Sequence, residues 1–252
     1  MAENHTLIDL PLPDGNQRTV AWGQLYGAAQ SLAVTEAAQR HGGTVLVIVD
    51  TAGHADQLMR ELKFFAPTLV ARRFSDYETL PYEPISPPKD LLADRLSTLH
   101  ALATGAPARV IVSSQALLNR LPPPAFVVAR SLQLHRGQDI DRDALAATLI
   151  EHGYLRVSQV NEPGEIAIRG AVVDIFPAGF KRAVRIDLFD REIETLRLFD
   201  AETQLADERC ESVSVLPARE FPFDQDAIRG FRQRFREAFP VEPGRCPVYN
   251  FP

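Results

Sequence analysis

Residues 23–31, GQLYGAAQS, have the outline of a phosphate-binding loop that leads into a helix. A functional loop reads G-x-x-x-x-G-K-[ST], because its glycines let backbone N–H groups approach the phosphates, its lysine offsets their charge and its hydroxyl binds magnesium. With Ser31 at the hydroxyl position, Gln24 and Ala29 replace the two glycines and Gln30 replaces the lysine. We therefore expect no ATP hydrolysis at this segment. The same letters are equally consistent with an ordinary loop that enters a helix.

A strand pattern, AVRIDLFD at residues 183–190, is the second candidate. Successive side chains of a strand point to opposite faces. Arg185, Asp187 and Phe189 therefore share one face, and the opposite, apolar face carries Val184, Ile186 and Leu188. Arginine and aromatic side chains together are typical of the anchors of protein interfaces, so this strand is a candidate binding surface.

Arg169 comes just before Gly170 in the neighbouring strand pattern, EIAIRGAVVDIF, and lies beside these residues if Gly170 forms a β-bulge. An alternative stays open from the residues alone. In it, Arg185 and Asp187 form solvated cross-strand ion pairs and Phe189 packs beneath a loop.

The sequence lacks other arrangements that perform chemistry. No histidine pair has the H-E-x-x-H spacing of a zinc protease, and no G-x-S-x-G nucleophile motif occurs. Cys210 and Cys246 form no C-x-x-C pair and are expected to be reduced thiols. A cluster of four acidic residues is more typical of a solvated hairpin than of a metal site: Asp187, Asp190, Glu192 and Glu194. We predict no catalytic, cofactor-binding or metal-binding residue.

The composition limits the classes of partner. The chain has 252 residues, 45% of them hydrophobic and 24% charged, which is ordinary for a globular protein. Its net charge of −6 opposes a broad phosphate-binding surface, because such surfaces need an excess of Lys and Arg. The N-terminus does not read as a signal peptide, and no apolar run approaches the roughly 18 residues of a membrane span. We therefore expect a cytoplasmic protein without a membrane partner.

The first half of the sequence alternates helix and strand patterns, which predicts a parallel sheet with helical crossovers. Helices are expected at 28–41, 53–65 and 90–102, and strands at 44–50, 69–74 and 109–114. The first strand, TVLVIVD, is nearly continuous in β-branched residues, so we expect it to be buried on both faces. Four prolines within 76–88 predict a surface loop, and Pro122–Pro124 mark a domain boundary.

The second half is rich in strand patterns. After a helix at 141–153, the segments EIAIRGAVVDIFP, AVRIDLFD and EIETLRLFD predict antiparallel strands joined by short turns, and hence a distinct α+β module. A last amphipathic helix is expected in DQDAIRGFRQRFREAF, because its apolar residues recur every three or four positions: Ile228, Phe231, Phe235 and Phe239.

Three stretches resemble one family: SDYETLPYEPISPPKDLLADRLSTL (75–99), IRGAVVDIFPAG (168–179) and RIDLFDREIETLRLFDAET (185–203). They are similar to the N-terminal region of the bacterial transcription-repair coupling factors, Mfd, which itself resembles the excision-repair protein UvrB. The resemblance runs from about Gly23 to Phe239. At Gln24, Ala29 and Gln30 the chain is similar to Mfd, because UvrB has a functional phosphate-binding loop there.

The resemblance implies a RecA-like α/β fold of the P-loop NTPase type, with a parallel sheet and a degenerate nucleotide site. An inserted α+β domain with an antiparallel sheet interrupts it. On this sequence, the implied parts are a first RecA-like part at 1–124, a UvrA-binding domain at 125–213 and a return to the RecA-like domain at 214–252. The implied UvrA-binding residues are Arg169, Arg185, Asp187 and Phe189, which favours the interface interpretation of the strand.

The implied function is that of a non-catalytic adaptor, which recruits UvrA to damaged DNA at a stalled RNA polymerase during nucleotide-excision repair. Full-length members of the family resemble ATP-driven DNA translocases. ATP, magnesium, RNA polymerase and double-stranded DNA are therefore implied for other domains, and no cofactor for these residues. Two alternatives are a UvrB-like ATP-hydrolysing helicase domain and an autoinhibitory contact in which C-terminal domains mask the UvrA-binding face.

Overall fold

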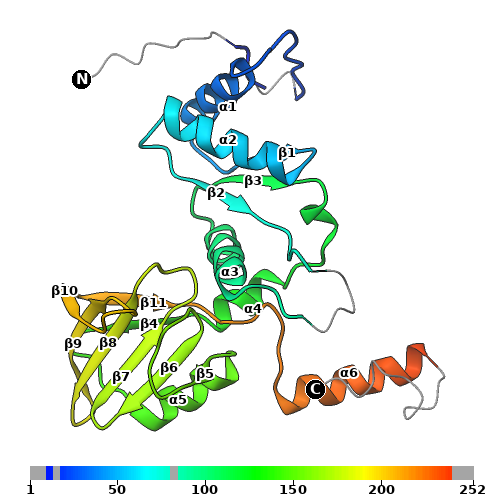
Figure 1. Ribbon diagram of the computed structural model, residues 1–252. Coiled ribbons are helices and arrows are strands. Elements are labelled where there is room, and N and C mark those ends of the chain that lie inside the picture. The colour runs from blue at the N-terminus through cyan, green and yellow to red at the C-terminus, as the bar shows by residue number, and fades with distance from the viewer. Residues whose placement is uncertain (1–9, 14–17, 80–84, 240–252) are drawn as a thin grey trace. The chain divides into compact units, whose positions relative to one another are not determined.

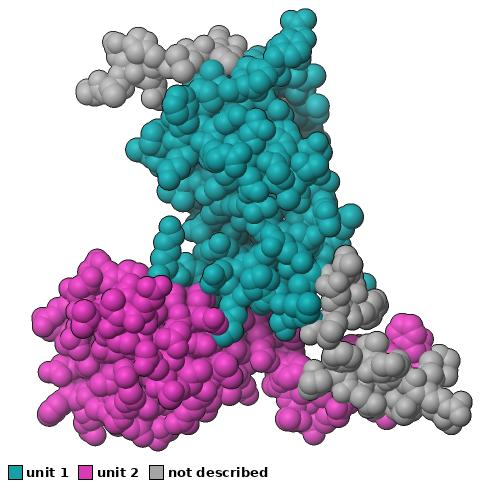
Figure 2. Space-filling view, viewed as in Figure 1, with its two compact units in different colours: residues 1–132, 178–181 teal, residues 133–177, 182–252 magenta. Residues whose placement is uncertain are grey.

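The computed structural model describes residues 10–13, 18–79 and 85–239. Cys246, the middle of the proline-rich loop and the end of the last predicted domain lie outside these ranges. Contacts group the chain into two compact units, one of residues 1–132 with 178–181 and one of residues 133–177 with 182–252 (Figure 2). Within the described ranges, none of the helices combines the length and the apolar composition needed to cross a lipid bilayer.

The first unit contains a three-stranded parallel sheet in the order β1-β3-β2 (Figure 1). The strands are β1 (Val45–Val49), β2 (Ala71–Phe74) and β3 (Arg109–Ser113). The helices between and before them are α1 (Ala29–Arg40), α2 (Ala52–Phe65) and α3 (Lys89–Ala103). The predicted alternation of helices and parallel strands is confirmed, with element ends that differ by one or two residues.

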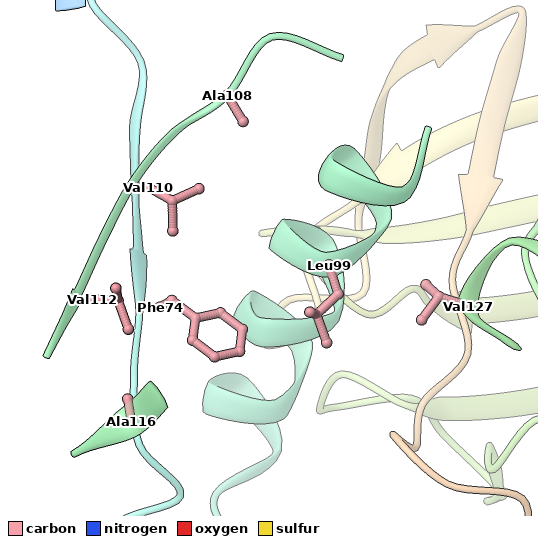
Figure 3. Packing of buried hydrophobic residues seen from close by; sticks show 7 residues of the cluster. All are labelled: Phe74, Leu99, Ala108, Val110, Val112, Ala116 and Val127. Carbon is pink, nitrogen blue, oxygen red and sulfur yellow. The ribbon is translucent and has the colours of Figure 1, made fainter. Parts of the chain in front are cut away.

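Apolar side chains pack against both faces of this sheet. On one face, Val49 and Ile111 pack with Leu58 and Leu62 of α2. On the other face, Val110 and Val112 of β3 belong to a second cluster with Phe74 and with Leu99 of α3 (Figure 3). The central strand β3 is therefore the one that is buried on both sides.

The prediction that the first strand is buried on both faces is wrong. Leu46 and Ile48 of β1 are 52% and 57% exposed. They are in register with Val110 and Val112 of β3, so they share the face on which α3 lies. However, β1 is an edge strand of the sheet and α3 packs against β2 on the far side of β3. A β-branched run is thus compatible with an edge strand that is covered on one face only.

A buried arginine holds the segment that follows β2. The side chain of Arg95 from α3 is fully buried, and its guanidinium lies 4.2 Å from the ring centre of Phe74 and 4.1 Å from that of Tyr77. The same group donates a hydrogen bond to the carbonyl oxygen of Ser75. Stacking on two rings compensates in part for the loss of water around the charge. The start of the proline-rich loop is therefore attached to α3 by one cation.

The second unit contains a six-stranded sheet in the order β10-β9-β8-β7-β6-β5 (Figure 1). Strands β6 to β10 are antiparallel neighbours, and β5 adds one parallel strand at the edge. The antiparallel arrangement predicted for the three segments of β6 to β9 is confirmed, but EIAIRGAVVDIF, expected to be one strand, forms the hairpin of β6 and β7. Their bounds are β5 (Leu155–Arg156), β6 (Glu165–Arg169), β7 (Val172–Phe176), β8 (Ala183–Phe189), β9 (Glu192–Phe199) and β10 (Ala206–Cys210).

Several short elements complete the fold. A second, two-stranded sheet pairs β4 (Leu132–His135) with β11 (Ser212–Val215). The helices are α4 (Pro124–Ala129), α5 (Arg142–Glu151) and α6 (Gln225–Ala238), with a 3-10 turn at Ala116–Leu118. The sequence does not predict β4, β5, β10, β11 or α4, because each is too short for a clear periodic pattern.

The last predicted helix is confirmed as α6, which begins at the N-cap Asp224. Phe231, Phe235 and Phe239 follow one another along it, with ring centres 5.9 and 4.9 Å apart. None of its residues is buried.

Replacing Arg95 tests its structural role. We expect Arg95→Met to lower the free energy of unfolding by about 2 to 3 kcal/mol, because two ring contacts and a buried hydrogen bond are lost. The matched control is Arg60→Met, an exposed arginine on α2, with an expected change below about 0.5 kcal/mol. Urea denaturation followed by circular dichroism measures both. Equal stability of the two variants would contradict the proposed role of Arg95.

Candidate partner-binding site

One face of the large sheet carries most of its charged side chains. We call it the arginine face and define it by the residues Arg169, Asp174, Arg185, Asp187, Phe189, Thr195, Arg197 and Arg209. Backbone register places these residues in rows across the strands, since directly paired residues point to the same side. One row runs from Asp174 through Arg185 and Arg197 to Arg209, and the next contains Asp187 and Thr195.

The alternation predicted for β8 is confirmed. Val184 and Ile186 are fully buried and Leu188 nearly so, whereas Phe189 is 74% exposed. Arg185 and Asp187 lie between these extremes and are half-buried. The predicted face is thus real, but only its aromatic member is freely exposed.

Asp174 is a buried carboxylate that binds two arginines of the arginine face. Its side chain is 1% exposed and accepts hydrogen bonds from Nε and Nη2 of Arg185, at 2.8 and 3.0 Å. Arg169 donates to the same carboxylate. A buried carboxylate is strongly destabilising unless it is paired, so these two arginines are also part of the fold. The hydrogen bond with Asp174 raises the pKa of Arg185 above its ordinary value.

Arg185 is held on two further sides. Its guanidinium lies 4.6 Å from the ring centre of Phe199, and Nη1 is 3.4 Å from the carbonyl oxygen of Gln204. Its side chain is 17% exposed, against 47% for Arg169. Arg185 is therefore positioned mainly to hold Asp174, and Arg169 has more surface free for a partner.

Asp187 makes a second set of cross-strand contacts. Its carboxylate accepts hydrogen bonds from Thr195 and from Arg197, whose Nη2 lies 2.7 Å away. The sequence analysis left open cross-strand ion pairs with Phe189 packed beneath a loop. The structure contains such pairs, with Asp174 and Arg197 as the partners, but Phe189 is not covered.

Gly170 does not form the β-bulge that was considered. Arg169 and Val172 are paired, so Gly170 and Ala171 form a two-residue turn between β6 and β7. Gly170 has φ of +61°, the left-handed conformation that such turns favour. Arg169 reaches the other charged residues because it ends its strand one row from Asp174, and no irregularity of β6 is needed.

Sequence reasoning missed Asp174, Thr195, Arg197 and Arg209. A signal for the first was present, because a carboxylate inside the apolar strand VVDIF needs a cationic partner. The partners could not be named, since Arg169 and Arg185 meet Asp174 only through the pairing of three strands.

A pocket of about 300 Å³ lies beside Phe189 and is lined by residues on both sides of it, Leu188 and Asp190. Ile140 and Gly170 also line it. Its arginines are paired locally: Arg142 with Asp143 at 3.0 Å, and Arg191 with Asp141 at 3.8 Å. The pocket is therefore a recess lined by both apolar and polar side chains, adjacent in sequence to Phe189.

The segment compared above with a phosphate-binding loop is not arranged as a magnesium site. The buried hydroxyl of Ser31 donates to the carboxylate of Glu61, and Gln57 donates to the other oxygen of that group at 2.8 Å. These hydrogen bonds hold the pKa of Glu61 below its usual value, so Glu61 is charged at neutral pH. In the described ranges, no group of three or more His, Cys, Asp or Glu side chains could hold a metal ion.

Arg185 and Arg197 provide a matched test of the Asp174 contact. We expect Arg185→Ala to lower the free energy of unfolding by about 2 to 4 kcal/mol, because it removes the main partner of a buried carboxylate. Arg197→Ala is expected to cost about 1 kcal/mol or less, because Asp187 is partly exposed to water and keeps Thr195. Urea denaturation of both variants checks this. A stable Arg185→Ala variant would show that Asp174 does not depend on this arginine.

The chain is similar to known proteins over nearly its whole length. The family model of the UvrB interaction domain matches residues 132–221, which contain the whole arginine face. The transcription-repair-coupling factor of Escherichia coli (strain K12) is 41% identical over 241 residues, which are 96% of this chain and 21% of that protein. That of Haemophilus influenzae is 34% identical over 231 residues, which are 92% of the chain and 20% of the relative.

The corresponding protein of Staphylococcus aureus (strain Mu50) is 31% identical and matches 94% of the chain. The chain spans about a fifth of the length of these relatives. It belongs to the transcription-repair-coupling factors as their N-terminal region, and it contains a UvrB interaction domain.

Proposed function

We propose that this chain binds a UvrA-type protein through Phe189 and the arginine face, and thereby recruits UvrA to damaged DNA where RNA polymerase has stalled. The observation that carries the proposal is the exposed ring of Phe189 at the end of β8, on the same strand face as arginines that the fold holds in place. The match to the UvrB interaction domain over the same residues supports it.

The geometry suits an interface anchor. Aromatic and arginine side chains carry much of the binding energy of protein interfaces. Arg169 and Arg185 are already oriented by Asp174, so little side-chain entropy is lost when a partner binds. In this arrangement the ring of Phe189 inserts into a recess of the partner, and Arg169 donates hydrogen bonds to the partner. Arg185 and Asp187 hold the neighbouring side chains Asp174 and Arg197 in position.

We propose further that the parallel sheet of the first unit belongs to a RecA-like domain, with parts at 1–124 and 214–252 around a UvrA-binding domain at 125–213. The parallel strands with α1, α2 and α3 between and before them support this assignment. The position of the degenerate loop at the start of α1 is also consistent with it.

We also propose that these residues bind no nucleotide and catalyse no reaction. Gln30 cannot supply the charge that a polyphosphate needs, and the charged carboxylate of Glu61 holds the hydroxyl that would bind magnesium. ATP-driven translocation, and contacts with double-stranded DNA and RNA polymerase, are proposed for other parts of the full-length protein. Those parts are also proposed to mask the arginine face until the motor engages.

Truncating the exposed ring tests the interface. We expect Phe189→Ala to weaken binding to purified UvrA by about 2 kcal/mol or more, roughly 30-fold, with unchanged unfolding stability because the ring is exposed. Isothermal titration calorimetry measures the affinity. The matched control is Phe64→Ala, another exposed phenylalanine, on α2. Equal affinities of wild type and Phe189→Ala would remove Phe189 from the interface.

Nucleotide titration separates the adaptor from the UvrB-like helicase alternative. With labelled ATP and magnesium we expect no saturable binding at micromolar concentrations and no phosphate release, because the lysine and both loop glycines are replaced. Micromolar binding with turnover would favour the helicase alternative.

A further inference from the structure

Three arginines stand side by side on adjacent strands of the arginine face. Arg185 of β8 is directly opposite Arg197 of β9, which is directly opposite Arg209 of β10. Neighbouring strands lie about 4.8 Å apart, so the row spans about 10 Å. Like charges directly opposite each other destabilise a sheet. The row therefore needs anions around it.

The chain supplies only part of that compensation. Asp174 pairs with Arg185 and Arg169, and Asp187 pairs with Arg197. Arg209 is exposed and makes no ion pair with any residue that the structure describes. Arg209 is thus the one arginine of the row for which the described residues supply no ion pair, although further carboxylates lie elsewhere on this face, Glu192 opposite Phe189 and Glu165 opposite Phe176.

We propose that an acidic surface of the UvrA-type partner covers this row, so that the interface extends from Phe189 across β9 to Arg209; this inference rests on the proposed function. Phe189 is four residues from Arg185 along β8, or about 13 Å. Phe189 and the arginine row together fit within one interface of standard size, which buries about 800 Å² on each partner. We expect the partner to contribute Asp and Glu side chains, because each carboxylate can pair with one arginine and separate side chains can match the spacing between adjacent strands.

A protein surface fits the row better than nucleic acid does. Within the described residues only Arg209 of the row is without an ion pair, whereas a stable contact with a phosphate backbone draws on several cations. Glu192 is directly opposite Phe189, so a phosphate backbone that followed the patch would meet a carboxylate beside the ring. A protein surface avoids both difficulties, because it can place acidic groups at Arg209 and an apolar recess or a cation beside Phe189 and Glu192, whereas a nucleic-acid backbone is negative along its whole length.

The two ends of the patch should differ in kinetics. A charge at the edge of an interface acts mainly on the association rate and its salt dependence, whereas an inserted aromatic ring acts mainly on dissociation. We expect Arg209→Glu to lower the association rate constant with UvrA about fivefold at low salt and to leave dissociation nearly unchanged. Phe189→Ala should mainly raise the dissociation rate constant.

The experiment measures association of the 252-residue chain with purified UvrA by surface plasmon resonance. It is done at about 50 mM salt, where charge interactions are weakly screened, and at about 300 mM salt, where they are strongly screened. Arg209→Glu is compared with Arg60→Glu, which makes the same charge change on an exposed part of α2. A slower association of Arg209→Glu alone, shrinking at high salt, supports the proposal.

The other outcomes overturn it in distinguishable ways. If Phe189→Ala weakens binding and Arg209→Glu matches wild type, the extension is wrong and the proposed function stands. If wild type does not bind UvrA, or neither variant changes binding, both fail. If an oligonucleotide duplex binds wild type and Arg209→Glu loses that binding, the row is a phosphate site and the acidic-protein proposal is wrong.

Discussion

The arginine face depends on one buried carboxylate. Asp174 lies in the middle of β7 with almost no access to water, and an unpaired charge there would destabilise the sheet by several kcal/mol. Arg185 and Arg169 must therefore remain beside it. This requirement orients two arginines toward the same spot on the surface. The contact that stabilises the second unit is thus the same contact that orients the arginines of the proposed partner-binding surface.

The same face of the sheet is divided into a covered end and an open end. At the covered end, Phe176, Ala183 and Phe199 pack with Val160 from the segment before β6. At the open end lie the charged rows and Phe189. Arg185 stands at the boundary, with its guanidinium over the ring of Phe199. A partner therefore meets polar groups that rest on an apolar layer, where hydrogen bonds are better shielded from water.

In the first unit, the segment proposed to be a degenerate nucleotide loop has its hydroxyl occupied by a carboxylate. Ser31 still occupies the hydroxyl position at the start of α1, but its hydroxyl is engaged by Glu61, a negative group where a working site needs a cation. The loop and the arginine face lie in different units and differ in the charges that they present. In the first unit a carboxylate, Glu61, accepts from the hydroxyl of Ser31, and in the second the described residues give Arg209 no ion pair.

Much of the fold and part of the site could be predicted from the sequence, because both follow from local periodicity. The alternation in β8 put Arg185, Asp187 and Phe189 on one face, and the helices of the first unit followed from their apolar spacing. Burial and pairing could not be predicted this way. Strand order made β3 central and left Ile48 of β1 exposed, and the register of three strands brought Arg169 and Arg185 to Asp174. Neighbours along the chain determine periodicity, whereas tertiary structure alone decides which distant strand lies opposite, and with it which charges are paired and which stay free.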